Sequence, residues 1–328
     1  MRERKKRPIL RKVLQILLGI FLFMLILPYF IPLSSKTEIP ALPYPNSAFF
    51  TTSDQVHIHY RLDTPNVVKG KILLVHGLAG STFSFRNNVA DLVAAGYQVV
   101  AIDLPAFGYS DRSSGLVHSQ VNRAKWLWEL LDKLDSESKD TRSWNLLGHS
   151  MGASTILAMS NQNPQRVVSL SILDGAVTQS SPSIPLVFDT PVGQWLKVYL
   201  RYSALSKDNI SKLLSSAYAK TADEQAVAGY LAPLLINKTP SALVDFVKTA
   251  KNVNIQDWKY PQTPMLVTWG EKDTWVKPTA IDEIKKYAKD LQVTLFPGQG
   301  HCTHETDPGF NKVLIDFLDA HNETNPLN

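Results

Sequence analysis

Ser150 lies between two glycines, Gly148 and Gly152, in the stretch GHSMG, which directly follows the apolar residues WNLL. An apolar run that ends in such a turn and continues into MGASTILAM predicts a strand, a sharp turn and a helix. Side chains at either glycine position would collide in a turn tight enough to expose the serine. The helix start adds unpaired N–H groups and a partial positive charge. The pattern indicates an exposed nucleophile; the alternative is a serine that only caps the helix.

A serine hydroxyl becomes a good nucleophile when a neighbouring base accepts its proton and an acid orients that base. Asp273, in WGEKD, follows one predicted buried strand, and His301, in GQGHC, follows the last one. Both residues would therefore lie with Ser150 at the strand-end edge where open α/β sheets bind their ligands. We expect Ser150, Asp273 and His301 to form a catalytic triad.

Two other residues could take a role in the triad, and three more lie next to it in the sequence. Asp174 also follows a predicted strand and could be the acid, and His304 could be the base, although it falls in the turn before the last helix. We expect Glu305 to support the local structure, His149 to point away from the site at a helix start, and Cys302 to form part of the pocket wall.

The loop after an early buried strand, in LVHGLAG, is suited to binding an oxyanion. Acyl transfer develops negative charge on an oxygen, which preorganised backbone N–H groups stabilise. We expect one N–H from Met151, the residue after the nucleophile, and a second from Leu78. His76 should be structural and fix this loop.

Metal chemistry has little support in the sequence. Cys302 is the only cysteine, so a cysteine-based zinc site and an intramolecular disulfide are both excluded. His57 and His59 could be a metal pair, but they alternate with apolar residues, which predicts that both lie on the outer face of a half-buried strand. We therefore expect neither a metal nor a cofactor.

The chain alternates between short apolar runs and helical patterns, which predicts an α/β fold with a mostly parallel sheet and helices on both faces. The core should comprise residues 47–175 and 259–328, beginning with a hairpin. Residues 176–258 read as helices without strands, and the segment is too long for a loop in a compact domain. We expect it to form an inserted helical cap over the strand ends.

The N-terminus combines a basic tail, residues 1–12, with an uncharged apolar stretch, residues 13–33. As a helix this stretch would be about 31 Å long, which is enough to span a bilayer. Pro28 could end the helix early, which would resemble a cleaved signal peptide and a secreted protein. A peripheral helix on a cytosolic protein is a third reading. We favour an anchor with a cytoplasmic N-terminus, an outside domain and an extended linker at 34–46.

The basic tail explains most of the formal net charge of +5. Seven of the 34 Lys and Arg residues, and one of the 29 acidic residues, fall within the first twelve positions. The rest of the chain is close to neutral. It has no basic patch of the kind that binds nucleic acid.

The stretches HGLAG, DLPAFGYSD, GHSMG, WGEKD and GQGHCTHETDP resemble the lidded α/β-hydrolase-fold family, which includes esterases, C–C bond hydrolases and cofactor-independent haloperoxidases. The resemblance runs from about residue 71 to the C-terminus. It implies the triad and oxyanion residues named above and no cofactor. Relatives that hydrolyse epoxides or haloalkanes have an aspartate nucleophile, so Ser150 argues against those reactions. Cys302 is another departure, since relatives often have a bulky residue there.

These features favour a membrane-anchored serine hydrolase that cleaves carboxylic esters. The apolar and aromatic content of the cap and the membrane anchor point to a hydrophobic small-molecule substrate, such as a lipid-like ester. Two alternatives stay open. The same triad could cleave an amide or the C–C bond of a diketone, or the fold could be a non-catalytic scaffold that binds a ligand.

Overall fold

The protein, for which we have a computed structural model, is described over residues 6–178 and 186–322. Its centre is an eight-stranded sheet in the order β1-β2-β4-β3-β5-β6-β7-β8. The strands are β1 (Ser47–Thr51), β2 (His57–Asp63), β3 (Gly70–Val75), β4 (Tyr97–Ile102), β5 (Trp144–His149), β6 (Val167–Leu173), β7 (Met265–Gly270) and β8 (Leu291–Phe296). β1 and β2 form the predicted hairpin, β2 is antiparallel to β4, and the remaining neighbours are parallel.

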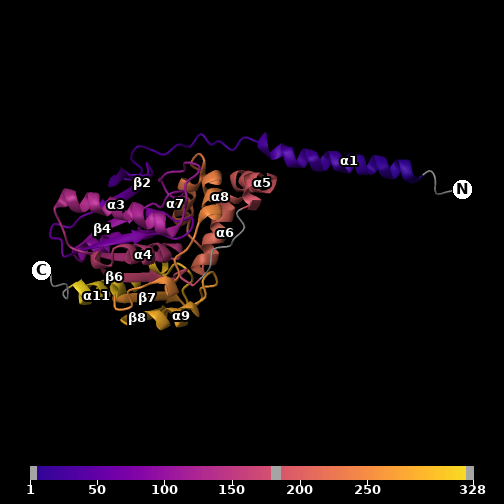
Figure 1. Cartoon of the computed structure of the whole chain (residues 1–328). Helices are drawn as coiled ribbons and strands as arrows, with labels where there is room; N and C mark the ends of the chain where they lie inside the picture. The colour runs from indigo at the N-terminus through magenta and orange to yellow at the C-terminus, as the bar shows by residue number, and fades with distance from the viewer. Residues whose placement is uncertain (1–5, 179–185, 323–328) are drawn as a thin grey trace.

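Helices cover both faces of the sheet, as the alternating pattern predicted (Figure 1). One face packs against α3 (Gln120–Ser138), α4 (Met151–Gln162) and α9 (Ala280–Tyr287). The other packs against α2 (Val89–Ala94) and α11 (Phe310–Asn322). Successive side chains of a strand point to opposite faces, and Leu73 and Leu74 of β3 accordingly belong to the two separate apolar clusters.

The cap consists of helices, as the sequence indicated for this segment. They are α5 (Pro191–Tyr199), a π-helical turn (Leu200–Ala204), α6 (Lys207–Tyr218), α7 (Glu224–Leu234) and α8 (Thr239–Thr249). Side chains of Thr190, Ser206 and Asp223 accept hydrogen bonds from the first-turn N–H groups of α5, α6 and α7, which is the usual N-cap interaction. The cap has its own apolar cluster, which also includes Cys302 of the core.

Short helices complete the described chain. They are the 3-10 turns η1 (Leu27–Tyr29), η2 (Thr82–Phe85), η3 (Pro164–Arg166), η4 (Leu186–Asp189) and η6 (Ile255–Asp257), and the one-turn α10 (Thr303–Thr306). Two of them, η2 and α10, contact each other next to the predicted site.

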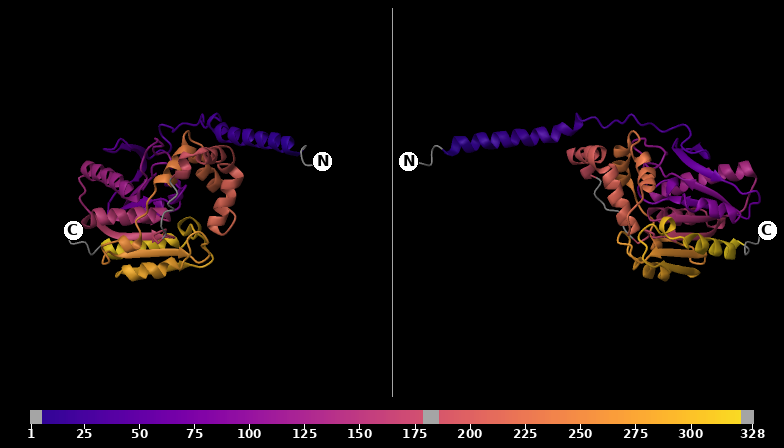
Figure 2. Two further views of the ribbon diagram at one scale, coloured as in Figure 1. Left: turned by 45° about the vertical axis from the view of Figure 1, so that its right-hand side comes forward. Right: turned by 180° about the vertical axis from the view of Figure 1, so that it is seen from behind.

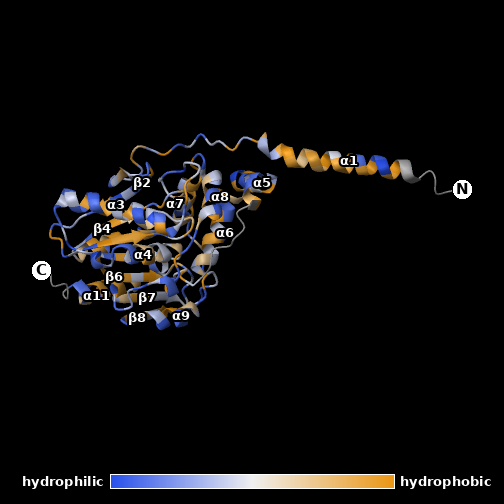
Figure 3. Cartoon of the chain, in the orientation of Figure 1, coloured by the Kyte–Doolittle hydropathy of each residue, from blue (hydrophilic) through white to orange (hydrophobic). Residues whose placement is uncertain are grey.

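The N-terminal helix α1 (Lys6–Ile26) projects away from the domain, on the side that carries the cap (Figures 1 and 2). It ends two residues before Pro28, in agreement with the steric restriction on residues that precede proline. Residues 9–29 are long and apolar enough to cross a membrane; within this stretch Pro28, in the 3-10 turn after α1, is buried, whereas most of the helix is exposed. Most of its residues are hydrophobic (Figure 3). A signal sequence near the N-terminus would have the same properties.

The prediction for His59 is wrong. His59 is fully buried, whereas His57 is exposed, so the two rings do not share an outer face. The Nδ1 atom of His59 lies 2.7 Å from a carboxylate oxygen of Asp103, and its Nε2 lies 2.7 Å from Ser47 Oγ. The loop after β4 and strand β1 cover this face of β2, which simple alternation along one strand does not reveal.

Candidate active site

Ser150 occupies the turn between β5 and α4 with φ of 49° and ψ of −117°. This left-handed backbone is strained for a non-glycine residue. A Cβ atom on Gly148 would come within 2.5 Å of the Gly152 backbone, and one on Gly152 would overlap the carbonyl oxygen of Val75 in β3. The two glycines are therefore required by the close packing of the turn, which is the reason expected from the sequence.

The side chains of Ser150, His301 and Asp273 form one continuous chain of hydrogen bonds. Ser150 Oγ lies 2.9 Å from His301 Nε2, and His301 Nδ1 lies 2.7 Å from Asp273 Oδ2. Because an ionised carboxylate only accepts hydrogen bonds, Nδ1 carries the proton and Nε2 is left to accept from the serine hydroxyl. All three residues are at least nine-tenths buried.

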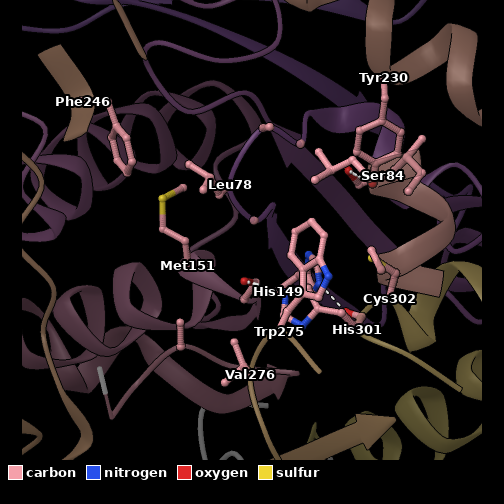
Figure 4. A pocket seen from close by; sticks show the side chains of 18 of the residues that line it. Leu78, Ser84, His149, Met151, Tyr230, Phe246, Trp275, Val276, His301 and Cys302 are labelled. Carbon is pink, nitrogen blue, oxygen red and sulfur yellow. Dashed lines mark hydrogen bonds between the residues drawn. The ribbon is translucent and has the colours of Figure 1, made fainter. Parts of the chain in front are cut away.

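The loop after β7 fixes the orientation of Asp273. Its second carboxylate oxygen, Oδ1, accepts hydrogen bonds from the backbone N–H groups of Trp275, at 2.8 Å, and Val276, at 3.1 Å. The indole ring of Trp275 stacks on the His301 ring, with centroids 5.5 Å apart and planes at 24° (Figure 4). The acid and the base are thus held by the same short loop.

Asp174, the alternative acid, makes different contacts. Its carboxylate accepts hydrogen bonds from the Gly270 N–H, at 2.9 Å, and from the Thr303 hydroxyl, at 3.1 Å. Burial raises the pKa of this carboxyl to about 7. Ligand atoms of Asp174, Asp273 and His301 lie within 4.8 Å of one another, an arrangement that could hold a metal ion. Both ring nitrogens of His301 are, however, already engaged by Ser150 and Asp273.

His304, the alternative base, is buried, and among the described residues only the Glu305 carboxylate lies within 4 Å of its ring nitrogens, at 3.8 Å from Nε2. Burial lowers its pKa to about 3, so the ring is neutral. His149 differs from the expectation, because it ends β5 instead of beginning a helix, and its Nε2 donates a 2.8 Å hydrogen bond to the carbonyl oxygen of His301. His149 therefore supports the backbone of the base and also lines the pocket.

The expected oxyanion donors lie beside Ser150. Leu78 and Met151 both line the same cavity as the serine (Figure 4). Met151 is the first residue of α4, where backbone N–H groups have no partner within the helix. The loop before Leu78 is held by His76, whose Nδ1 donates to the Gly77 carbonyl at 2.6 Å and whose Nε2 accepts from the Leu104 N–H at 3.0 Å. Burial lowers the pKa of His76 to about 4, which keeps it neutral.

The cavity over Ser150 has a volume of about 350 Å³ and lies between the core and the cap. Most of its lining is apolar, and the cap supplies Leu213, Leu214, Tyr230, Phe246 and Val247. Among the described residues that line it there is no lysine, arginine or carboxylate. Cys302 forms part of the wall, as expected, and burial raises the pKa of its thiol.

Glu305 has a larger role than the sequence suggested. Its fully buried carboxylate accepts hydrogen bonds from Tyr218, at 2.6 Å, and Tyr230, at 2.5 Å, both from the cap, and forms an ion pair with Arg86 of the core. The Tyr230 hydroxyl also lies 2.8 Å from Ser84 Oγ. This cluster joins the cap to the loop that carries His301, and no local pattern could have indicated it because its members are far apart in the sequence.

The family model for the alpha/beta hydrolase fold matches residues 71–308. The chain belongs to this family. The Bacillus subtilis (strain 168) hydrolase YugF is 30% identical over 276 residues, covering 81% of this chain and 96% of YugF. The 2-hydroxy-6-oxononadienedioate/2-hydroxy-6-oxononatrienedioate hydrolase of Cupriavidus pinatubonensis is 25% identical, covering 86% of this chain and 99% of that protein.

Solved structures share the fold of this α/β hydrolase. A bacterial membrane phospholipase A superposes with a TM-score of 0.66 at 19% identity, covering 98% of this chain and 100% of that one. A probable hydrolytic enzyme from Pseudomonas aeruginosa PAO1 superposes with a TM-score of 0.71 at 18% identity, covering 88% and 99%. YugF and the Cupriavidus relative are both named as hydrolases, which together with the family match supports hydrolase activity for this chain.

Proposed function

We propose that this α/β hydrolase is a membrane-anchored serine esterase that cleaves carboxylic esters with hydrophobic acyl groups. The observation that carries the proposal is the hydrogen-bonded chain from Ser150 through His301 to Asp273, at 2.9 Å and 2.7 Å, at the floor of an apolar cavity. This arrangement activates a serine hydroxyl without a metal or cofactor.

In the proposed reaction, Ser150 Oγ attacks the acyl carbon while His301 Nε2 accepts the hydroxyl proton. The oxygen of the tetrahedral intermediate becomes negatively charged, and the N–H groups of Leu78 and Met151 stabilise it. The C–O bond to the alcohol then breaks, and His301 returns the proton to the departing alkoxide. A water molecule releases the acid from the acyl-enzyme by the same steps, and Asp273 stabilises the imidazolium in both halves.

The lining of the cavity supports a neutral, apolar acyl group. A substrate such as the dioate in the Cupriavidus relative's name carries carboxylates, which in a buried pocket require cationic partners. The described lining offers none, and the cap contributes leucine, phenylalanine and valine side chains instead. An ester of a hydrophobic acid fits this chemistry better than a dicarboxylate whose C–C bond is cleaved.

The anchor in this proposal is α1 together with the residues that follow it. Residues 9–29 have a mean hydropathy of 2.2, and the basic residues of the chain's start lie on their N-terminal side. Basic residues favour the cytoplasmic side of a membrane. We therefore place the N-terminus in the cytoplasm and the hydrolase domain, with its cap, on the other side; cleavage after the helix would instead give a secreted enzyme.

The proposal is tested with matched p-nitrophenyl esters from acetate to palmitate, the corresponding anilides, and vinylogous diketones with and without a carboxylate. The account predicts the highest kcat/KM for an ester with a medium or long acyl chain. In Ser150→Ala and His301→Ala, kcat/KM for that ester should fall by several orders of magnitude. A higher kcat/KM for the carboxylate-bearing diketone would favour C–C hydrolysis. Folded protein without turnover of any of these substrates would favour a binding scaffold.

A further inference from the structure

The chain that leaves α1 is held by the cap. Side chains of α5 and of the π-helical turn after it donate hydrogen bonds to three backbone carbonyls spaced four residues apart: Trp195 to Met24 at 2.8 Å, Gln194 to Pro28 at 3.4 Å, and Tyr202 to Pro32 at 2.6 Å. Nearby, the backbone N–H of Asn237, which lies between α7 and α8, donates to the Thr37 carbonyl at 2.7 Å. The linker expected at 34–46 therefore begins along the cap surface.

The length of α1 determines how deep in a bilayer the hydrogen bonds between this part of the chain and the cap would lie. The uncharged run begins at Val13, and α1 ends at Ile26, so the helical part is about 21 Å long at 1.5 Å per residue. A bilayer core is about 30 Å thick, so residues 27–33, which comprise the 3-10 turn η1 and the irregular chain after it, are needed to complete the span. Backbone carbonyls at that depth require hydrogen-bond partners from protein, because lipid offers none. The donors on α5 and the adjoining turn supply them.

The exposed side chains around this junction are also suited to a membrane surface. Val192, Tyr199 and Tyr202 are 60%, 57% and 58% exposed, and Lys197 is the only charged residue of α5. Tyrosine and tryptophan are enriched where the polar headgroups meet the acyl chains. We propose that α5 and the π-helical turn dock into the interface of the bilayer that α1 spans. The inference rests on the proposed anchor.

Docking in this position brings the lipid close to the catalytic cavity. α5 packs against α8, and an ion pair between Asp189, just before α5, and Lys248 of α8 joins the two elements at 2.5 Å. On its other side α8 contributes Phe246 and Val247 to the cavity over Ser150. A hydrophobic ester held in the membrane beside α5 is thus separated from the cavity by α5 and α8, two helices that pack against each other.

The test places a fluorescent probe on α5 of the full-length protein. Cys302 is replaced by alanine, and Val192→Cys is labelled with a nitrobenzoxadiazole group. The matched control is Val67→Cys, which is 79% exposed before β3, at the end of the sheet opposite the cap. The proteins are reconstituted in phosphatidylcholine/phosphatidylglycerol vesicles that contain a nitroxide-labelled lipid. The proposal predicts a blue-shifted probe at residue 192 that is quenched at least twofold, and an unquenched probe at residue 67.

Equal emission and quenching at the two positions would overturn the proposal. Membrane retention after alkaline carbonate extraction is measured on the same samples, and loss of the protein from the vesicles would overturn both the anchor and the docking surface. Hydrolysis of p-nitrophenyl butyrate is measured in parallel on the wild-type protein in the same vesicles, because Cys302 forms part of the pocket wall. Quenching at residue 192 without hydrolysis would contradict the proposed esterase function and leave the docking surface intact.

Discussion

The backbone N–H of His301 donates a 2.6 Å hydrogen bond to the carbonyl oxygen of Ala217, in the last turn of α6. Next to it, the Trp275 indole N–H donates to Ser216 Oγ at 3.1 Å. The loops that carry the proposed base and acid are therefore both attached to the same end of one cap helix. This end of α6 helps to hold the proposed acid and base in place, because it cannot move away without breaking these bonds.

Replacement of Gly300 by alanine should damage catalysis through this attachment. A Cβ atom at residue 300 would overlap the Ala217 carbonyl oxygen, so the base loop and α6 must separate. A displacement of about 1 Å at a catalytic group costs on the order of 100-fold in rate, and we expect a loss of that size in kcat with p-nitrophenyl butyrate. The matched control is Gly309→Ala, whose Cβ would approach only the Asp307 side chain, at 3.2 Å. A wild-type kcat in Gly300→Ala would show that the attachment is dispensable.

The buried Glu305 carboxylate should contribute strongly to stability. Glu305→Ala would leave Arg86, whose side chain is only 18% exposed, without its partner, and would remove the acceptor of two buried tyrosine hydroxyls. Loss of one partner of a buried pair typically costs about 3–5 kcal/mol, to be measured by urea unfolding.

The control for Glu305 is the surface pair of Glu283 and Lys286. Glu283→Ala should change the free energy of unfolding by less than about 1 kcal/mol, because solvent screens exposed pairs. If both variants lost a similar amount of unfolding free energy, the Glu305 cluster would not be what holds the cap to the core.

Asp174 should make stability depend on pH near neutrality. Burial raises its pKa to about 7, so the folded protein holds a proton that the unfolded chain releases at a lower pH. Its contribution to stability is full below the unfolded pKa, near 4, and is lost as the pH rises to about 7. Relative to Asp174→Asn, the wild-type protein should therefore lose stability between pH 5 and pH 7.5 in urea titrations. If the difference in unfolding free energy between the wild-type protein and Asp174→Asn stayed constant across this pH range, the prediction would be contradicted.

Much of the fold follows from local patterns in the sequence. The strands and helices of the core were expected because buried parallel strands are short apolar runs and their crossover helices are amphipathic. The sharp turn at Ser150 was expected because the short motif contains Gly148 and Gly152, and any side chain at these two positions would clash in such a turn. Asp273 and His301 were predicted as acid and base from their positions after strand ends, and the structure places their side chains 2.7 Å apart.

Other parts of the site depend on contacts between distant segments, and local patterns do not report these. The burial of His59 comes from Asp103, 44 residues away, and the contact of His149 with the His301 backbone joins residues 152 apart. The pattern indicated a helical cap but not which end of α6 meets His301. Likewise, the apolar run near the N-terminus predicted the helix α1 but not the contacts that α1 makes with α5.

The most direct test of the central claim is covalent labelling of the intact protein with a fluorophosphonate, followed by peptide mass spectrometry. Ser84 is the matched control, because it lines the same cavity but its Oγ lies 2.8 Å from the Tyr230 hydroxyl and has no histidine partner. The account predicts modification at Ser150, none in Ser150→Ala, a loss of several orders of magnitude in labelling rate in His301→Ala, and unchanged labelling in Ser84→Ala. Folded protein that is not labelled, or that is labelled at Ser84, would contradict the assignment of Ser150 as the nucleophile.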